Sequence, residues 1–360
     1  MNILYEWYQR TVSDPQAVIL VLLLALFFIV MLTLGQMLAP VLAGVVIAYL
    51  LDGVVEKFHQ LGAPRVSAVT VVFLLFMSFL VFAMFWLVPR LFTQVTQLVS
   101  QLPDIIQLGQ DVLLQLPEKY PNMFNAEQVH ELGATIRAEI TELSQRVLSL
   151  SLPAVFGLIS LMVYIILVPV LAFFFLKDKT RILAWFSQRL PRQRRLVDEV
   201  TRDVNEQVSN YVRGKVWEIF IVGGAAFALF TIMGLQYALL LATMVGLSVI
   251  IPYIGAAAVT VPVAMIAWFQ WGWSAESGWL LMAYLVLQAL DGYLLVPLLF
   301  SEVVNLHPVA IIIAILVFGG LWGFWGVFFA IPLATLVQAV MQAWPKKGKE
   351  EDAPGTAAPA

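Results

Sequence analysis

The distribution of basic residues along the chain constrains its fold more than any other feature. Residues 216–345 contain no lysine or arginine and a single histidine, His307, whereas ten lysines and arginines lie within residues 177–215. The apolar part is long enough for several membrane crossings, and basic segments beside such crossings stay in the cytoplasm. The sequence therefore predicts a polytopic membrane protein, whose few polar residues at membrane depth are the candidates for function.

Composition agrees with this class and excludes several others. Hydrophobic residues make up 61% of the chain and charged residues 12%, with a mean hydropathy of +0.90, whereas a soluble domain carries about 25% charged residues. The formal charge of −3 supplies no positive field for nucleic acid. Because the chain has no cysteine, disulfides, thiol catalysis and thiolate metal sites are excluded. The N-terminus lacks the small-residue cleavage site of a signal peptide, and we expect no cofactor.

Five plain apolar runs predict the first membrane spans. Gly35 and Gln36 separate the first two runs, which we expect to form a tight helical hairpin, and Pro89 should end the third. Pro169 should kink the fourth run without ending it. The predicted spans are residues 17–34, 37–51, 66–88, 152–176 and 216–234.

The lysine and arginine content of the loops predicts the orientation. Residues 90–151 have four basic and seven acidic residues, whereas residues 177–215 have ten basic and five acidic ones. The positive-inside rule then places residues 90–151 in the periplasm and both termini in the cytoplasm. The predicted organisation is three membrane helices in 1–89, a periplasmic segment in 90–151, a fourth membrane helix in 152–176, a basic cytoplasmic segment in 177–215, a transport core in 216–345 and a disordered tail in 346–360.

Both connecting segments show helical spacing of apolar residues. In the outer segment we expect two or three amphipathic helices, which form a packing cap or partner surface or, alternatively, a substrate-binding vestibule. In the inner segment an apolar stripe from Leu196 to Tyr211 predicts a helix along the membrane surface. Its role is either anchoring or gating.

The apolar C-terminal part contains two segments that Gly and Pro interrupt, 237–271 and 308–344, with a plain span at 279–296 between them. Paired interrupted segments are typical of transporters, because unwound backbone leaves carbonyl and amide groups available for substrate or ion. The alternative is close helix packing, for which membrane helices often use glycine. If each segment crosses once, the chain has about eight transmembrane helices; re-entry stays open. The residues at the breaks are Pro252, Tyr253, Gly255, Gly319, Gly320, Gly323 and Gly326.

Five polar residues cluster between the two interrupted segments. Asp291 lies within an apolar stretch, and Gln288 precedes it by nearly one helical turn on the same face. A carboxylate in hydrocarbon costs about 2.5–3.5 kcal/mol on insertion scales, so Asp291 needs a partner, a proton or a cation. Alternatively, it is protonated or caps a helix beside Gly292. The remaining three, Glu302, Asn305 and His307, are possible pathway residues that we expect nearer the outer interface.

Several short motifs are distributed along the chain, most of them in its C-terminal half. They are Asp14-Pro15, 176–179 (LKDK), 211–215 (YVRGK), 251–256 (IPYIGA), 288–292 (QALDG), 305–308 (NLHP), 318–326 (FGGLWGFWG) and 330–333 (AIPL). Together these motifs resemble the autoinducer-2 exporter family, and the resemblance covers essentially the whole chain. Tyr293 stands where the family often has Asn, which leaves Gln288 and Asp291 as the matching polar candidates.

The resemblance implies an inner-membrane transporter of about eight helices that forms homo-oligomers such as pentamers. Members are associated with export of autoinducer-2, and some with sodium/proton antiport. Since no nucleotide motif, Ser/His pair or zinc motif is present, we expect a secondary transporter and not an enzyme. The sequence predicts a permease, an exporter of a small polar solute; a sodium/proton antiporter using Asp291 and a non-transporting membrane scaffold are the alternatives.

Overall fold

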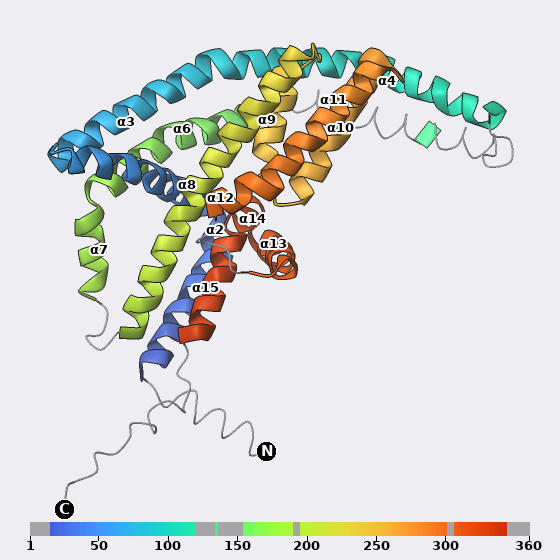
Figure 1. Cartoon of the computed structure of the whole chain (residues 1–360). Helices are drawn as coiled ribbons and strands as arrows, with labels where there is room; N and C mark the ends of the chain where they lie inside the picture. The colour runs from blue at the N-terminus through green and yellow to red at the C-terminus, as the bar shows by residue number, and fades with distance from the viewer. Residues whose placement is uncertain (1–14, 120–133, 136–153, 190–194, 301–305, 344–360) are drawn as a thin grey trace, which may run out of the picture. The chain divides into compact units, whose positions relative to one another are not determined.

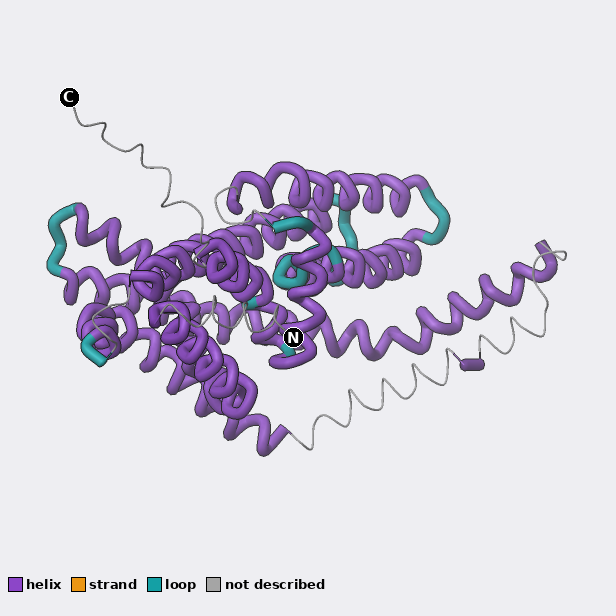
Figure 2. Tube along the Cα trace, turned by 90° about the horizontal axis from the view of Figure 1, so that it is seen from below, coloured by secondary structure: helices purple, strands orange, loops and turns teal. Residues whose placement is uncertain are grey.

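The computed structural model describes residues 15–119, 134–135, 154–189, 195–300 and 306–343. Every regular element within these ranges is an α-helix or a short π-helix, and no strand occurs among them (Figures 1 and 2). The predicted all-α class is therefore confirmed. The predictions for the N-terminal stretch, most of the second half of the periplasmic segment, Glu302, Asn305 and the tail fall outside the described residues.

The helices also have the length and composition of membrane spans. Six stretches in the described part are long and apolar enough to cross a bilayer, and four shorter apolar helices accompany them. Large apolar side chains are widely exposed along them, as is expected where the surrounding solvent is lipid. The chain is thus a multi-pass membrane protein. The six stretches are Val18–Gly35, Met37–Gln60, Arg65–Ile105, Val197–Ile232, Ile254–Trp271 and Ala275–Phe300.

The first two predicted spans form one unbroken helix, α2 (Pro15–Gln60), so the expected hairpin at Gly35 and Gln36 is wrong. Glycine lowers helix stability by only about 1 kcal/mol, which is less than the cost of leaving backbone groups unpaired in apolar surroundings. Pro40 also lies inside α2. At about 1.5 Å per residue the helix is roughly 69 Å long, more than a bilayer core requires.

Pro89 does not end the third span either. Helix α3 (Arg65–Phe82) continues through a π-helical turn, η1 (Ala83–Leu87), into α4 (Val88–Lys119). Proline lacks an N–H and its ring collides with the carbonyl four residues earlier. The π turn avoids this collision by widening the helix, and the N–H of Val88 bonds the carbonyl of Ala83, five residues back.

The basic segment and the fifth span also join into one helix. After α6 (Ala154–Lys177), which contains Pro169 as predicted, comes the short α7 (Lys179–Ser187). Helix α8 then runs from Arg195 to Ile232 without interruption, so the expected boundary between the inner helix and the fifth span is wrong. The predicted helix from Leu196 to Tyr211 is confirmed, and its place along the membrane surface stays a prediction. Two residues of its predicted apolar stripe, Val200 and Tyr211, are buried.

The first interrupted segment is a helical hairpin. Helix α9 (Ala238–Ser248) packs against α10 (Ile254–Trp271), and α10 packs in turn against α11 (Ala275–Leu290) (Figure 1). Eleven residues of α9 reach only about 16 Å, roughly half of a hydrocarbon core. The segment is therefore broken at residues 249–253, and whether it crosses or re-enters the membrane stays open.

The second interrupted segment folds back in the same way. Helix α13 (Pro308–Trp322) packs against both the short α14 (Phe324–Phe328) and α15 (Ala330–Ala343). Gly323 forms the turn between α13 and α14 with φ of 59°, a conformation that glycine adopts without strain. Gly319, Gly320 and Pro332 lie inside helices and do not interrupt them.

The predicted plain span at 279–296 contains a second π turn. Helix α11 continues through η2 (Asp291–Leu295) into α12 (Val296–Phe300), where Pro297 follows. The N–H of Val296 bonds the carbonyl of Asp291, which repeats the arrangement before Pro89. Asp291 therefore begins a widened turn and not a regular helical one.

The described helices belong to two compact units. The first comprises residues 1–42, 178–213 and 300–360, and the second comprises residues 43–177 and 214–299. In the first, Leu20 of α2 and Val197 and Val200 of α8 share a small core with residues of α15. In the second, α8, α9, α10 and α11 enclose the largest core, with Tyr284 and Phe230 fully buried. Leu91 and Leu98 of α4, which belong to the helical spacing of apolar residues predicted for the outer segment, pack against this core.

Candidate transport site at the helix breaks

The break between α9 and α10 depends on Gly255. A Cβ at this position would collide with the carbonyl oxygen of Ser248, so the first turn of α10 lies directly on the last residue of α9. No side chain larger than hydrogen fits this contact. The predicted role of Gly255 in close backbone approach is therefore confirmed, while its place in a pathway stays a prediction.

A strained turn leads from the break into α10. The N–H of Ile254 bonds the carbonyl of Pro252 at 2.7 Å, and Tyr253 between them has φ 63° and ψ −52°. These are the features of a γ-turn with positive φ, which is rare and strained for a residue with a Cβ. The Tyr253 side chain is exposed, so the strain lies in the backbone.

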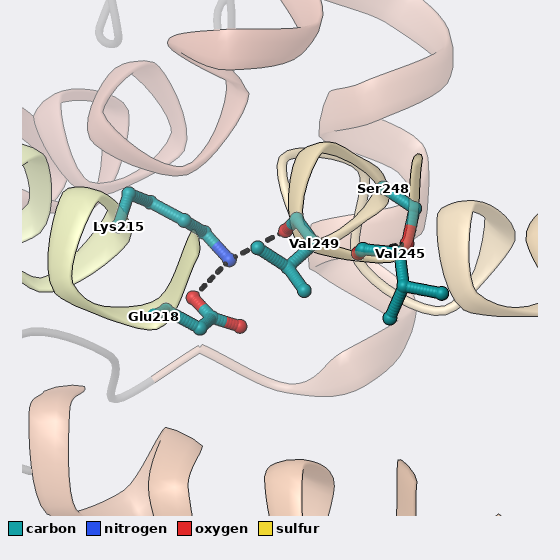
Figure 3. Close-up of polar contacts among 5 residues, drawn as sticks. All are labelled: Lys215, Glu218, Val245, Ser248 and Val249. Atoms are coloured by element: carbon teal, nitrogen blue, oxygen red, sulfur yellow. Dashed lines mark hydrogen bonds and ion pairs between the residues drawn. The ribbon is translucent and has the colours of Figure 1, made fainter. Parts of the chain in front are cut away.

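A buried ion pair contacts the end of α9. The Lys215 ammonium on α8 donates to Oε2 of Glu218 at 2.7 Å and to the carbonyl oxygen of Val249 at 2.8 Å (Figure 3). Lys215 and Glu218 are only 3% and 2% exposed. The last carbonyls of a helix lack intrahelical partners and attract cations. Lys215 therefore occupies the position at a half-helix C-terminus where transporters hold a coupling cation.

Two glycines bring α8 and α9 close enough for this contact. A Cβ on Gly246 would lie 2.9 Å from the carbonyl oxygen of Ile219 and 3.0 Å from Cα of Gly223. Gly246 precedes Val249 by about one helical turn, and Ile219 adjoins Glu218. Gly246 belongs to the first segment predicted to be interrupted, but it lies inside α9 and serves helix packing.

Asp291 completes the charged cluster. Its Oδ1 is buried and has no hydrogen-bond partner among the residues that the structure describes. Asp291 interacts electrostatically with both Lys215 and Glu218. Lys215, which lies one residue before the long stretch without basic residues, is thus a cation that acts on Asp291. We name Lys215, Glu218 and Asp291 the charged triad.

The triad has a defined charge balance. The triad contains two carboxylates and one ammonium, so the fully ionised group carries one net negative charge. Each buried ion loses several kcal/mol of hydration, and one proton or one monovalent cation would bring the net charge to zero. Among the described residues, no group of three or more His, Cys, Asp or Glu is placed to hold a metal ion.

The second break shares the glycine geometry of the first. A Cβ on Gly326 would collide with the carbonyl oxygen of Phe318, and one on Gly319 would lie 2.8 Å from Cγ2 of Val327. Gly320, in contrast, has open space around its Cα. The two breaks therefore share one structural feature: a glycine early in the second half-helix packs on a backbone carbonyl of the first half-helix.

Aromatic rings surround the second break. Phe28 of α2 stacks with Phe318 and Trp322 at ring-centroid distances of 6.5 and 5.7 Å, and these two rings stack with each other at 5.7 Å. We name Phe28, Phe318 and Trp322 the aromatic stack. Offset stacking contributes about 0.5–1.5 kcal/mol per pair beyond area burial.

The remaining predicted residues have simpler positions. Gln288 is half-buried near the end of α11. His307 is exposed and caps α13, since its Nδ1 accepts a hydrogen bond from the N–H of Val309 at 3.3 Å. The two interrupted segments belong to different compact units. From the sequence we also expect these segments to meet near the bilayer midplane, close to Asp291 and Gln288, and this meeting stays a prediction.

Sequence reasoning missed Lys215 and Glu218. Lys215 belongs to the predicted basic cytoplasmic segment, and Glu218 falls within a predicted apolar span. A usable signal was present, because a Lys and a Glu three residues apart face each other on a helix. An acidic residue three positions inside a predicted span is a natural partner for a lysine just before that span.

Comparison with known proteins agrees with this architecture. A family model described as AI-2E family transporter matches residues 17–346. "Putative permease PerM" of Escherichia coli strain K12 is 42% identical over 345 residues, which cover 96% of this chain and 98% of that protein. "Putative transport protein YueF" of Bacillus subtilis is 28% identical, with 83% of this chain and 82% of that protein covered.

Proposed function

The chain belongs to the AI-2E transporter family, and we propose that it is a secondary transporter that exports a small polar solute such as autoinducer-2. We place it in the bacterial inner membrane with both termini in the cytoplasm. Its named relatives are permeases and transport proteins, and none of those cited is named as an enzyme.

The observation that carries the proposal is the charged triad at the α9–α10 break. Lys215 binds a carbonyl at the end of a half-helix, and Asp291 keeps a buried oxygen without a hydrogen-bond partner among the described residues. Broken helices with exposed carbonyls and a buried carboxylate are the parts from which secondary transporters build substrate and ion sites. A membrane scaffold that transports nothing would not need buried charged side chains, whose loss of hydration is unfavourable.

A sodium/proton antiporter is the second candidate. An antiporter usually needs more than one buried carboxylate. Asp291 is one such group, and the buried Glu218 is a second. Two carboxylates that share one ammonium could exchange a proton for a sodium ion. The difference between the two candidates is whether an organic solute moves at all.

Flux through proteoliposomes tests both candidates. We expect the purified protein to move autoinducer-2 or a similar polar solute along a gradient, with a rate that depends on pH or sodium. Asp291→Asn keeps the shape and removes the charge, so this ion dependence should disappear while assembly is retained. Glu276→Gln on the same helix is the matched control, because Glu276 is exposed at the start of α11, and it should behave as wild type.

The outcomes separate the candidates. Sodium and proton counterflow without any solute would establish the antiporter. Unchanged flux and ion dependence in Asp291→Asn would make Asp291 structural and remove the coupling role. We also propose a homo-oligomer such as a pentamer, on the basis of the sequence resemblance. A monomer mass in mild detergent and in native nanodiscs would contradict it.

A further inference from the structure

We propose that the charged triad is a proton-operated clamp on the α9–α10 break, in which the Lys215 ammonium exchanges between Glu218 and Asp291. The inference deepens the proposed transport function, because it assigns the coupling ion and the moving part of the same site. In the structure the Lys215 ammonium is paired with the Glu218 carboxylate and also donates a hydrogen bond to the Val249 carbonyl. This is the clamped arrangement.

The break is built to move when Lys215 leaves. Val249 is followed within four residues by the strained γ-turn at Tyr253, and such strain persists only where the surroundings hold it. Lys215, on a different helix, restrains this region by its hydrogen bond to the Val249 carbonyl (Figure 3). When the ammonium moves away, the carbonyl loses this partner and the turn can relax.

Asp291 is the alternative partner because of its buried oxygen. Its Oδ1 has no hydrogen-bond partner among the described residues, and its charge acts on both Lys215 and Glu218. Helices α9 and α10, which form the break, carry no charged side chain. The electrostatic partners that the structure identifies for Asp291 and Glu218 are therefore members of the triad itself. A π turn, which often marks a functional position in a helix, begins at Asp291.

One proton operates the clamp. In the clamped state Glu218 is the carboxylate paired with Lys215, the carboxyl group of Asp291 holds a proton, and the triad is neutral. Loss of this proton to water leaves Asp291 ionised and draws Lys215 to it, so that the Val249 carbonyl is released; binding of a proton from water at Asp291 reverses the step. Because the released state holds one proton fewer, labelling should become faster as the pH rises. Lys215 stays charged throughout.

A single cysteine at Ser248 reports on the break. The chain has no native cysteine, and Ser248 ends α9 directly before Val249. We would measure the rate of maleimide labelling of Ser248→Cys in nanodiscs across a pH series, with and without sodium. A parallel single cysteine at Leu61, which is 84% exposed, corrects for the pH dependence of the thiol reaction itself.

The two carboxylates should give opposite results. Glu218→Gln imitates the protonated acid and sends Lys215 to Asp291, so labelling should become faster than in Asp291→Asn by about 5- to 150-fold, the usual range of a coupling between sites. Asp291→Asn keeps Lys215 on Glu218 and should give slow labelling. Both variants should lose the pH dependence that the otherwise unchanged protein shows.

Several results would overturn the clamp. It fails if both variants keep the original pH dependence, or if Asp291→Asn labels faster than Glu218→Gln. A rate that follows sodium and not pH would overturn the proton assignment. If Glu218→Gln does not fold, Asp291→Asn alone decides, because loss of pH dependence at a slow rate is required of it. Labelling needs no flux, so an absent flux with an intact clamp, or the reverse, tells the two proposals apart.

Discussion

The two helix breaks have the same backbone device and opposite surroundings. At each break a glycine, Gly255 or Gly326, packs its Cα on a carbonyl of the preceding half-helix. The first break is held by the buried pair of Lys215 and Glu218, and the second is held by the aromatic stack that includes Phe28. Ionic contacts can be made and broken by a proton, whereas stacked rings respond to neither protons nor small ions. The comparison therefore supports the proposal that coupling belongs to the first break, whereas we expect a constant structural role for the rings at the second.

The largest expected effect tests the shared backbone device. Gly255→Ala and Gly326→Ala each introduce a Cβ that collides with a backbone carbonyl. Overpacking costs about 1–3 kcal/mol where side chains can adjust, and we expect more here because backbone must move. Thermal unfolding in detergent, followed by tryptophan fluorescence, should show a large loss of stability for both variants.

Two other glycines serve as controls for that test. A Cβ added at Gly278 in α11 or at Gly320 in α13 would meet no heavy atom of a neighbouring side chain or helix within 4 Å. Alanine is favoured over glycine inside a helix by about 0.5–1 kcal/mol, so both control variants should be as stable as the parent or slightly more stable. Equal stability of all four variants would show that the close approach does not exist.

The next largest effect concerns the ion pair alone. Lys215→Met leaves Glu218 buried without its cation, and removal of one partner of a buried pair costs about 3–5 kcal/mol. The double variant Lys215→Met/Glu218→Met removes both charges and should recover most of the stability while losing ion-dependent flux. A double-mutant cycle of unfolding free energies gives the coupling, and a coupling near zero would mean that the pair is not formed.

The features that could be predicted from the sequence are those that depend on a residue's own backbone and not on contacts with distant residues. The positions of the two breaks followed from Pro252, Gly255, Gly323 and Gly326, since these residues act on their own backbone. The prediction of a turn at Gly35 was wrong because a helix in apolar surroundings continues through a single glycine unless another contact ends it.

The prolines also show that the effect of a residue on a helix depends on the turn that precedes it. Pro89 was expected to end a span, but it follows a π turn that removes the collision, and Pro297 follows a second one. The triad was predicted only in part, through Asp291. Its contact between Lys215 and Val249 joins residues 34 positions apart, and it depends on close packing at Gly246 that periodicity does not reveal.

A smaller effect tests the aromatic stack. Phe28→Leu keeps an apolar side chain but removes two stacked pairs, so we expect a loss of about 1–3 kcal/mol at about 0.5–1.5 kcal/mol per pair. The pH and sodium dependence of flux should not change. Phe92→Leu is the control, because Phe92 is 73% exposed on α4, and its stability should match the parent. A shift in ion dependence in Phe28→Leu would contradict the division of roles between the breaks.

The smallest effect concerns His307 at the start of the second hairpin. The sequence made His307 a pathway candidate, whereas the structure uses its Nδ1 to cap the N–H of Val309 at 3.3 Å. Loss of an N-cap costs about 0.5–2 kcal/mol, and this long, exposed bond should lie near the lower limit. His307→Ala should therefore lose about 0.5 kcal/mol of unfolding free energy, and His307→Asn, which can cap a helix equally well, should lose less. Neither variant should alter flux, because the second break owes its stability to glycine contacts and stacked rings that His307 does not touch. A large flux defect in both variants, with normal stability, would return His307 to the pathway and give the second break an ionic function as well.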